Sequence, residues 1–276
     1  MAGSREVAKH YTHGSLLDAI RDGIGGIGKT PETVTIDDLA PIDEFHIGGR
    51  VASVEFLDQL SLTNQSHVLD VGCGLGGPAR FAASHYGATV TGIDLTAEFV
   101  QAGQVLCRWV GLENTITLVE GSALAMPFGN SGFDAAYMMH VGMNIADKET
   151  LFGEVARVLK PGATFGIYDV MQTGDTGISF PVPWAETAAT SALASPGQYK
   201  SALETAGFEI TAQRNRRHFA LAFFAELAAL TKAAGGPPPL GIHILMGESR
   251  AIKVKNMADN IAAGRIAPVE LIARLY

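Results

Sequence analysis

The chain has 276 residues, of which 47% are hydrophobic and 17% are charged, and its formal net charge at pH 7 is −8. This composition supplies enough apolar material for a core and excludes an intrinsically disordered chain, and the negative charge argues against a nucleic-acid partner. No apolar stretch is long enough to cross a bilayer, the N-terminal region lacks the apolar segment of a signal peptide, and two cysteines give no disulfide framework, so we expect a cytoplasmic protein.

Residues 1–50 are rich in Gly and Asp, and we interpret them as a lid that leads into a helix over 51–60. Tyr11 lies in this segment and is a candidate to fold over a ligand. The remaining residues, 51–276, form the main domain in this prediction.

The segment 68–77, VLDVGCGLGG, carries most of the functional information. An apolar run over 67–71 is typical of a buried parallel strand, glycines then allow a tight turn, and a helix begins at Pro78. A strand, a glycine turn and a helix in this order predict a nucleotide-type binding crevice.

The glycines fit two patterns. Gly72, Gly74 and Gly77 satisfy the dinucleotide fingerprint, whereas Gly72, Gly74 and Gly76, preceded by Asp70, are similar to the loop of methyltransferases that use S-adenosylmethionine (SAM). A carboxylate at Asp70 repels a pyrophosphate but attracts the ammonium group of SAM. Asp94 follows the next strand, 88–93, at a spacing that suits the ribose of either ligand. Asp70 therefore favours SAM.

The alternation of elements continues downstream and predicts an α/β fold with a doubly wound, seven-stranded, mostly parallel sheet. Asp147 is expected to cap one of the helices. Cap insertions are expected near 172–190 and 215–250, the second containing the breaker GGPPP at 235–239. The further strands are expected at 116–120, 133–138, 163–170, 208–213 and 269–275, and the helices at 97–110, 147–159, 198–206 and 250–263.

Candidate site residues lie where strands end, because ligands bind at the carboxyl edge of such a sheet. His140 follows the strand 133–138 and is a candidate SAM contact or polar wall of the site, with a hydrogen-bonded loop histidine as the alternative. Asn144 is a candidate to orient a polar group of the substrate or to cap a helix. Of Tyr168 and Asp169, at most one is expected to face the crevice.

Other candidates lie in the flanking segments. His46 or Arg50 is expected to meet the carboxylate of SAM, the alternative for Arg50 being a surface ion pair with Glu44 or Glu55. Trp184 is a candidate to pack against a substrate or to anchor a loop. Two further groups of side chains favour a structural role over a ligand contact. Apolar side chains at helical spacing suggest core or a dimer face (Phe219, Phe223, Phe224 and Leu227). A run of basic side chains suggests a solvated turn (Arg214, Arg216, Arg217 and His218).

Together these motifs resemble class I SAM-dependent methyltransferases of the type 11 small-molecule group, with their Rossmann-like fold. The resemblance rests on VLDVGCGLGG at 68–77, GIDL at 92–95, MPF at 126–128 and RVLKPG at 157–162. A looser similarity to the sarcosine/dimethylglycine and phosphoethanolamine N-methyltransferases rests on HIGG at 46–49 and NMADNIAAG at 256–264.

The resemblance implies roles for individual residues. Gly72 and Gly74 would approach the methionyl part of SAM, Asp94 would bind the ribose, and His140 would lie beside the methionyl group. The adenine would be flanked by Leu95, Ser122, Ala123 and Leu124. Ser122 stands where the family often has an acid.

Asn144 is another departure, because it stands where phosphoethanolamine methyltransferases place a histidine that pairs with an N-terminal tyrosine. Asparagine cannot act as a general base.

We therefore predict an enzyme that moves a methyl group from SAM to a nitrogen or oxygen atom of a small molecule by in-line displacement. The alternatives are a SAM-binding protein with a cyclase or regulatory role and, with less support, an NAD(P)-dependent oxidoreductase. We expect S-adenosylhomocysteine (SAH) as the product. No bound metal, nucleic-acid partner or membrane partner is expected, and a homodimer is left open.

Overall fold

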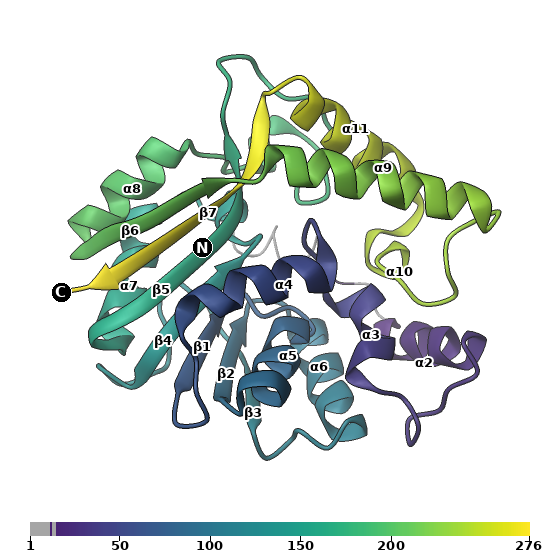
Figure 1. Cartoon of the computed structure of the whole chain (residues 1–276), viewed down its shortest axis with the longest axis horizontal. Helices are drawn as coiled ribbons and strands as arrows, with labels where there is room; N and C mark the ends of the chain where they lie inside the picture. The colour runs from purple at the N-terminus through teal and green to yellow at the C-terminus, as the bar shows by residue number, and fades with distance from the viewer. Residues whose placement is uncertain (1–11, 13–14) are drawn as a thin grey trace.

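A seven-stranded sheet with strand order β3-β2-β1-β4-β5-β7-β6 forms the centre of the computed structural model, which describes residues 12 and 15–276 (Figure 1). The strands β1 to β5 pair in parallel, and β7 runs antiparallel to both β5 and β6. The predicted fold class is confirmed. The strands are β1 (His67–Val71), β2 (Thr89–Asp94), β3 (Ile116–Glu120), β4 (Phe133–Met139), β5 (Leu159–Gln172), β6 (Phe208–Asn215) and β7 (Ile266–Leu275).

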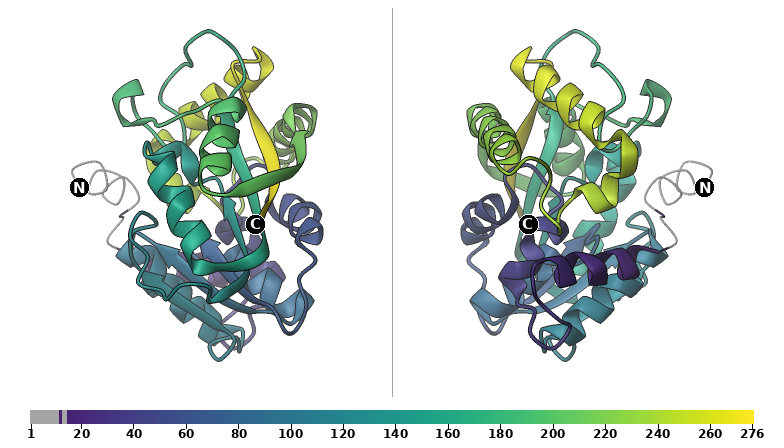
Figure 2. Two further views of the ribbon diagram at one scale, coloured as in Figure 1. Left: turned by 90° about the vertical axis from the view of Figure 1, so that its left-hand side faces the viewer. Right: turned by 90° about the vertical axis from the view of Figure 1, so that its right-hand side faces the viewer.

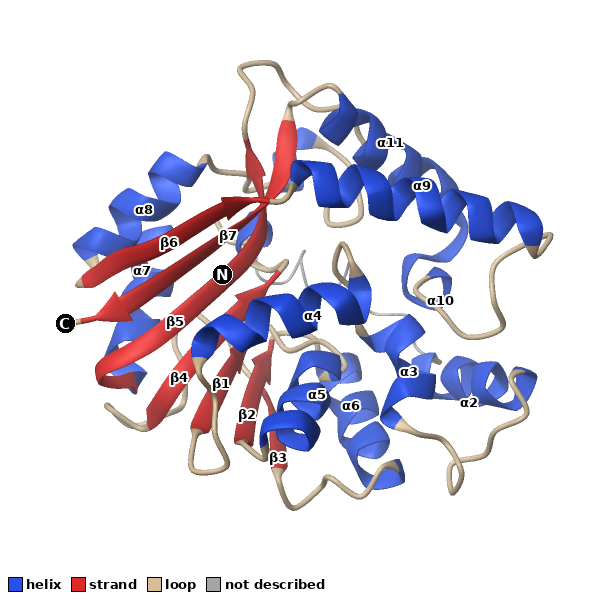
Figure 3. Cartoon of the chain, viewed as in Figure 1, coloured by secondary structure: helices blue, strands red, loops and turns tan. Residues whose placement is uncertain are grey.

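Helices cover both faces of the sheet, as Figure 3 shows. One buried cluster joins the sheet to α7 and α8, and a second joins it to α4, α5 and α6. The helices are α2 (Leu16–Gly26), α3 (Ile36–Asp43), α4 (Gly49–Leu57), α5 (Gly77–Tyr86), α6 (Ala97–Trp109), α7 (Lys148–Val158), α8 (Pro196–Thr205), α9 (Arg217–Ala233), α10 (His243–Met246) and α11 (Arg250–Ala262).

The order of the strands reverses between β1 and β4, which are neighbours in the sheet although two strands separate them in the sequence. Such a switch point opens a crevice at the carboxyl ends of the strands. The glycine loop after β1 lies at this point, so the topology places the predicted binding loop at the crevice.

Two groups of elements outside the sheet form a cap over its carboxyl edge (Figures 1 and 2). The helices α2 and α3 share an apolar cluster with Leu240 and Leu245 from the region around α10. The helices α9 and α11 share another cluster with the loop that contains Trp184. The side-chain amide of Asn260 exchanges two hydrogen bonds of 2.9 Å with the backbone of Ser179 and thereby holds this loop on α11.

Element boundaries agree closely with the expectations, with two informative differences. The helix predicted at 51–60 begins at Gly49 and continues beyond Leu57 as a 3-10 turn. The fifth strand was expected to begin at residue 163 but begins at Leu159. The pairing of β4 with β5 shifts register between Phe133 and Ala135, and Gly162 has a left-handed backbone conformation, so the segment Lys160-Pro161-Gly162 stays within the strand.

The prediction of a solvated turn for the basic run 214–218 was wrong for Arg216 and Arg217, although Arg214 and His218 are exposed. Arg216 is buried and forms ion pairs with Glu270 at 2.8 Å and Glu55 at 2.6 Å. Arg217 donates hydrogen bonds to two carbonyl groups at the end of α11, those of Ile261 and Ala262. The run therefore joins β6, β7, α4 and α11.

Within the described part of the chain, no helix is long and apolar enough to cross a membrane, and Cys73 and Cys107 are free thiols.

Gly77 begins α5 beneath the N-terminal segment, and a Cβ at this position would overlap the backbone carbonyl of Asp43. We expect Gly77→Ala to destabilise the fold by about 1–3 kcal/mol, because neither backbone segment can move freely. Gly153→Ala is the control: Gly153 lies in α7 with open space around it, so alanine should stabilise the protein by up to about 1 kcal/mol. Thermal denaturation of both variants measures these effects, and equal stability of the two would contradict the close packing at Gly77.

Candidate functional site

A cavity of about 1570 Å³ opens at the carboxyl ends of β1, β2 and β4 and extends beneath the cap. Its volume exceeds the range of about 300–1,000 Å³ that is common for a single drug-sized ligand. One wall is formed by the glycine loop and the ends of the strands, and the others by α3, α4, the loop around Trp184, α9, α10 and α11. The cavity can therefore hold two small molecules side by side.

The glycine loop has the backbone geometry that its sequence predicts. Gly72, Gly74 and Gly76 adopt positive φ angles of 75°, 53° and 80°. A Cβ at Gly72 would collide with Val141, whereas a Cβ at Gly74 would have no atom within 4 Å and would project into open space. The backbone at Gly74 is therefore open to a ligand in the cavity, while Gly76 does not line it and instead caps the N-terminus of α5.

Two carboxylates flank this loop in different environments. Asp94 accepts hydrogen bonds from the backbone N–H groups of Gly74 at 2.9 Å and Thr96 at 2.8 Å. Asp70 is buried and accepts a hydrogen bond of 3.0 Å from the hydroxyl of Tyr137. Burial raises the pKa of Asp70 to about 8, so its side chain is mostly protonated at pH 7.

A strap, defined here as residues 43–53, crosses the start of α5 and lines the cavity. Asp43 anchors it through a fully buried ion pair with Arg80 of α5, in which the nitrogen and oxygen atoms lie 2.6 Å apart. Glu44, also buried, accepts hydrogen bonds from Arg50 at 2.6 Å and from the hydroxyl of Ser53 at 2.5 Å. The pair between Arg50 and Glu44 is therefore largely buried, unlike the surface pair considered from the sequence, and Nη2 of Arg50 is buried without a partner.

His46 in the strap lies near two other rings, that of His140, which also lines the cavity, and that of Tyr168, which does not. The ring centroids of the two histidines are 6.1 Å apart, and those of His140 and Tyr168 are 5.1 Å apart. Burial lowers the pKa of His140 well below its ordinary value, and His46 lowers it further, so His140 is neutral.

Two buried polar atoms in this wall have no hydrogen-bond partner: Nε2 of His140 and Oδ1 of Asn144. His140 also has a φ angle of 56°, which is uncommon for a residue with a side chain. Unpartnered buried polar atoms are costly, so both atoms point to contact with a ligand.

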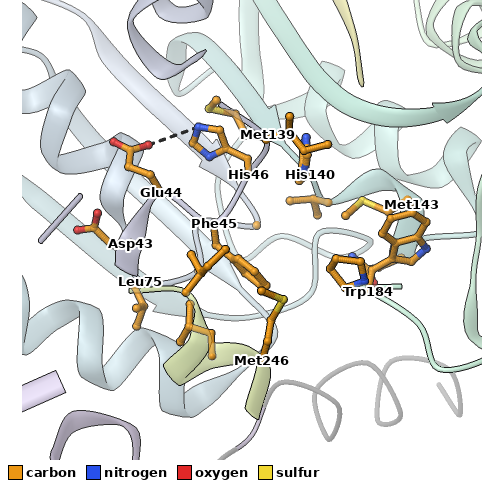
Figure 4. A pocket seen from close by; sticks show the side chains of 18 of the residues that line it. Asp43, Glu44, Phe45, His46, Leu75, Met139, His140, Met143, Trp184 and Met246 are labelled. Carbon is orange, nitrogen blue, oxygen red and sulfur yellow. Dashed lines mark ion pairs between the residues drawn. The ribbon is translucent and has the colours of Figure 1, made fainter. Parts of the chain in front are cut away.

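The cap side of the cavity is predominantly apolar, although charged side chains of the cap also line it (Glu186, Lys232, Arg250 and Lys255). Met143 and Trp184 lie together on this wall, and Leu75 and Met246 also line the cavity (Figure 4). The indole N–H of Trp184 donates to Ser191 at 2.9 Å, so the ring both anchors its loop and forms part of the wall. The helices contribute Phe223, Phe224 and Leu227 from α9 and Val254, Met257 and Ala258 from α11.

The structural interpretation of the α9 side chains was incomplete, because Phe223 and Phe224 pack against a buried cluster but also line the cavity. Phe223, Phe224 and Leu227 line the cavity, whereas Phe219 packs against Gly48 and the guanidinium of Arg216. Neither Tyr168 nor Asp169 lines it: the hydroxyl of Tyr168 donates to the carbonyl of Ile47, and Asp169 accepts a hydrogen bond from Tyr199.

The cavity brings together most of the residues that the sequence singled out. Tyr11 lies outside the described residues. The predicted residues that line the cavity are His46, Arg50, Asp70, Gly72, Gly74, Asp94, Leu95, Ser122, Ala123, Leu124, His140 and Asn144. Ser122 uses its hydroxyl to accept a hydrogen bond from the backbone of Leu124 at 3.2 Å.

Sequence reasoning missed the partners that hold the strap, namely Asp43, Ser53 and Arg80. Within the described residues, no three His, Cys, Asp or Glu side chains gather in a way that could hold a metal ion.

Comparison with known structures identifies the class of fold. The geranyl diphosphate C-methyltransferase from Streptomyces coelicolor A3(2) superposes with a TM-score of 0.73 at 17% identity, covering 100% of this chain and 99% of the other. A putative sarcosine dimethylglycine methyltransferase from Galdieria sulphuraria gives 0.69 at 19% identity, with 93% and 98% coverage. The [4+2]-cyclase SpnF also gives 0.69, at 23% identity with 99% and 96% coverage. These likenesses show a methyltransferase fold.

Sequence comparison then identifies the domain. Residues 69–167 match the family model described as a methyltransferase domain. Sterol 24-C-methyltransferase ERG6B from Gibberella zeae is 39% identical over 106 residues, which are 38% of this chain and 28% of that protein. Methyltransferase GfsG from Streptomyces halstedii is 27% identical over 213 residues, or 76% and 74%.

Residues 69–167 therefore carry a methyltransferase domain, as predicted, and solved methyltransferases with this fold hold SAM or SAH. The match with the first relative spans less than a third of that protein's length, so the similarity concerns the domain that binds the methyl donor.

The ion pair between Asp43 and Arg80 is fully buried, so removal of one partner leaves an unpaired charge. We expect Arg80→Met to destabilise the protein by about 3–5 kcal/mol, and the double variant Arg80→Met/Asp43→Asn to be more stable than this single variant. Chemical denaturation measures both. A single variant as stable as the wild type would show that the pair does not anchor the strap.

Proposed function

We propose that this chain transfers a methyl group from SAM to a predominantly apolar small molecule bound beneath the cap. One observation carries the proposal: the glycine loop and its two carboxylates share a single cavity with the apolar wall of α9 and α11. A methyltransferase needs this continuity, because the acceptor atom must lie about 3 Å from the methyl carbon and in line with the leaving sulfur.

The residues of the strand-end wall fit the donor. Asp94 would accept hydrogen bonds from the ribose, and Leu95, Ser122, Ala123 and Leu124 would flank the adenine. The open backbone at Gly74 leaves room for the methionyl part. Asp70 would attract its ammonium group, and the unpartnered Nη2 of Arg50 would bind its carboxylate. His140 would lie beside the same part of the donor.

The apolar cap wall supports the proposed class of acceptor. Large apolar side chains from three separate elements converge there, and transfer of an apolar molecule into such a wall is favourable. Proteins with matching domains act, by their names, on sterols, botryococcene and geranyl diphosphate, all of which contain large hydrocarbon parts.

The sequence prediction of a nitrogen or oxygen acceptor stays a prediction, because several of these relatives are named as carbon methyltransferases. Bound SAM supplies an electrophilic methyl group and a neutral leaving sulfide. The protein then has to align the acceptor, exclude water and handle a proton if the acceptor atom carries one. Asn144, whose Oδ1 has no partner, is placed to orient a polar group of the acceptor.

A second function, cyclisation without methyl transfer, is favoured by the likeness to the [4+2]-cyclase SpnF over nearly the whole chain. The remaining alternative, an NAD(P)-dependent oxidoreductase, would need a pyrophosphate beside Asp70, which is unfavourable once that carboxylate ionises.

Calorimetric titration with SAM, SAH and NADH tests the donor site. We expect binding of SAM and SAH alone, and an affinity about 10- to 100-fold lower in Asp94→Ala, because that variant loses charge-assisted hydrogen bonds to the ribose. Ala123→Ser, a small change on the adenine side, is the control and should lower the affinity for SAM much less than Asp94→Ala does. Binding of NADH alone would contradict the proposal.

A screen with isotopically labelled SAM and apolar acceptors that carry hydroxyl, amine or alkene groups tests the transfer. Mass spectrometry of the products identifies the methylated atom. SAM binding without any labelled product across the panel would favour the cyclase alternative.

The raised pKa of Asp70 predicts a pH dependence of SAM binding. The ammonium of SAM favours the ionised carboxylate, so binding below pH 8 should release a proton, and affinity should rise as the pH increases towards about 8. Asp70→Asn keeps an acceptor for the Tyr137 hydroxyl but cannot ionise, so it should bind SAM more weakly and lose this dependence. Titrations in buffers with different ionisation enthalpies measure the proton release, and no release in the wild type would contradict the role of Asp70.

A further inference from the structure

We infer that His46 accepts the proton of a hydroxyl group on the acceptor, so that the methylated atom is an oxygen. This inference rests on the proposed function and assigns His46 a role different from a contact with the carboxylate of SAM. It also names Glu44 and Ser53 as positioning residues. The argument depends on which nitrogen of the His46 ring carries the proton.

Three oxygen atoms surround Nε2 of His46. The carbonyl of Gly49 and the hydroxyl of Ser53 lie 3.1 Å away, and the carboxylate of Glu44 lies 3.5 Å away. The carbonyl and the carboxylate can only accept, and the Ser53 hydroxyl already donates its proton to Glu44. Nε2 must therefore hold the proton, which leaves Nδ1 of the neutral ring with a free electron pair.

The unprotonated nitrogen lies on the open side of the ring. His46 lines the cavity, and its Nδ1, which has no hydrogen-bond partner among the described residues, is not one of the fully buried polar atoms. Figure 4 shows the ring joined to Glu44 through its other nitrogen. Glu44 and Ser53 fix this orientation because both are buried and bonded to each other. A base held in one tautomer by a carboxylate behind it is a common arrangement in enzymes.

The charges around the ring suit a base that works near neutral pH. Burial lowers the pKa of His46, so the ring is neutral and able to accept a proton, while the carboxylate of Glu44 partly opposes this shift. The other groups that face it are Arg50 of α4, His140 after β4 and Tyr168 of β5. Of these groups only Glu44 stabilises the imidazolium, since Arg50 disfavours it and His140 is neutral.

This geometry favours a hydroxyl acceptor. A neutral amine already has a free electron pair, whereas an alcohol or phenol oxygen becomes a good nucleophile only as its proton leaves. In the proposed step, the acceptor oxygen forms a bond to the methyl carbon while the carbon–sulfur bond breaks and its electron pair stays on the sulfur. The hydroxyl proton moves to Nδ1 of His46, and the imidazolium later releases a proton to water.

The two roles for His46 differ in an observable way. Contact with the carboxylate of SAM requires a proton on the nitrogen that faces the cavity, whereas a base requires that nitrogen to be bare. Long-range proton–nitrogen NMR of protein labelled at histidine, recorded with and without SAH, reports the tautomer directly, and His46→Gln assigns the signal. This readout needs no acceptor and is separate from SAM affinity.

We expect a neutral His46 ring at pH 7 with its proton on Nε2, and we expect Glu44→Gln to lower its pKa further. A proton on Nδ1, or a charged ring at pH 7, would overturn the inference while leaving the proposed function intact. Failure of SAH to bind, measured by calorimetry, would instead count against the proposed function.

Kinetics on the products of the acceptor screen give the second test. With a hydroxylated acceptor, His46→Gln should lower kcat about 10²- to 10⁴-fold with little change in SAM affinity, whereas the exposed His218→Gln should leave kcat unchanged. In Glu44→Gln, the fall in rate at acid pH should move to lower pH. An unchanged kcat in His46→Gln, or methylation at nitrogen or carbon only, would overturn the inference.

Discussion

The site depends on the attachment of the strap to the start of α5. The buried ion pair of Asp43 with Arg80, and the close contact of the strap backbone with Gly77, hold it against the glycine loop. Through Glu44 and Ser53 this attachment continues to His46, and through Arg50 to the wall of the cavity. If the strap moved, the proposed SAM site would lose one of its walls and His46 would lose its orientation. The buried contact between the strap and α5 therefore supports both the proposed SAM side and the proposed acceptor side of the cavity.

The strand-end wall and the cap wall of the cavity are built differently, which suits the separate tasks proposed for them, binding SAM and binding the acceptor. The donor wall comes from strand ends and a glycine loop with fixed backbone hydrogen bonds, such as those from Gly72 and Cys73 to the carbonyl of Ile93. The proposed acceptor wall comes from cap helices that differ in packing: within α9 only Ala220 is buried, whereas α11 buries five side chains. A proposed donor site built on strand ends, joined to a separate and largely apolar cap, allows one domain design to serve different acceptors.

Sequence reasoning predicted the sheet and the conformation of the glycine loop well because their signals are local. The strand and glycine pattern from 67 to 77, the acid Asp94 and the cap at Asp147 each depend on neighbours in the sequence. The acceptor side could not be predicted, because helical spacing cannot distinguish a cavity wall from a core, as Phe223 and Leu227 show. The Asp43 anchor of the strap has its partner 37 residues away, and the buried Arg216 has partners 54 and 161 residues away, which no local pattern reveals.

A crystal structure with bound SAH tests the central claim, that donor and acceptor share one cavity joined at the strap, most directly. The account predicts the ribose at Asp94, the adenine between Leu95 and Ala123, and the sulfur directed towards the compartment lined by His46, Trp184 and α9. A ligand bound elsewhere, or a sulfur directed away from that compartment, would contradict it.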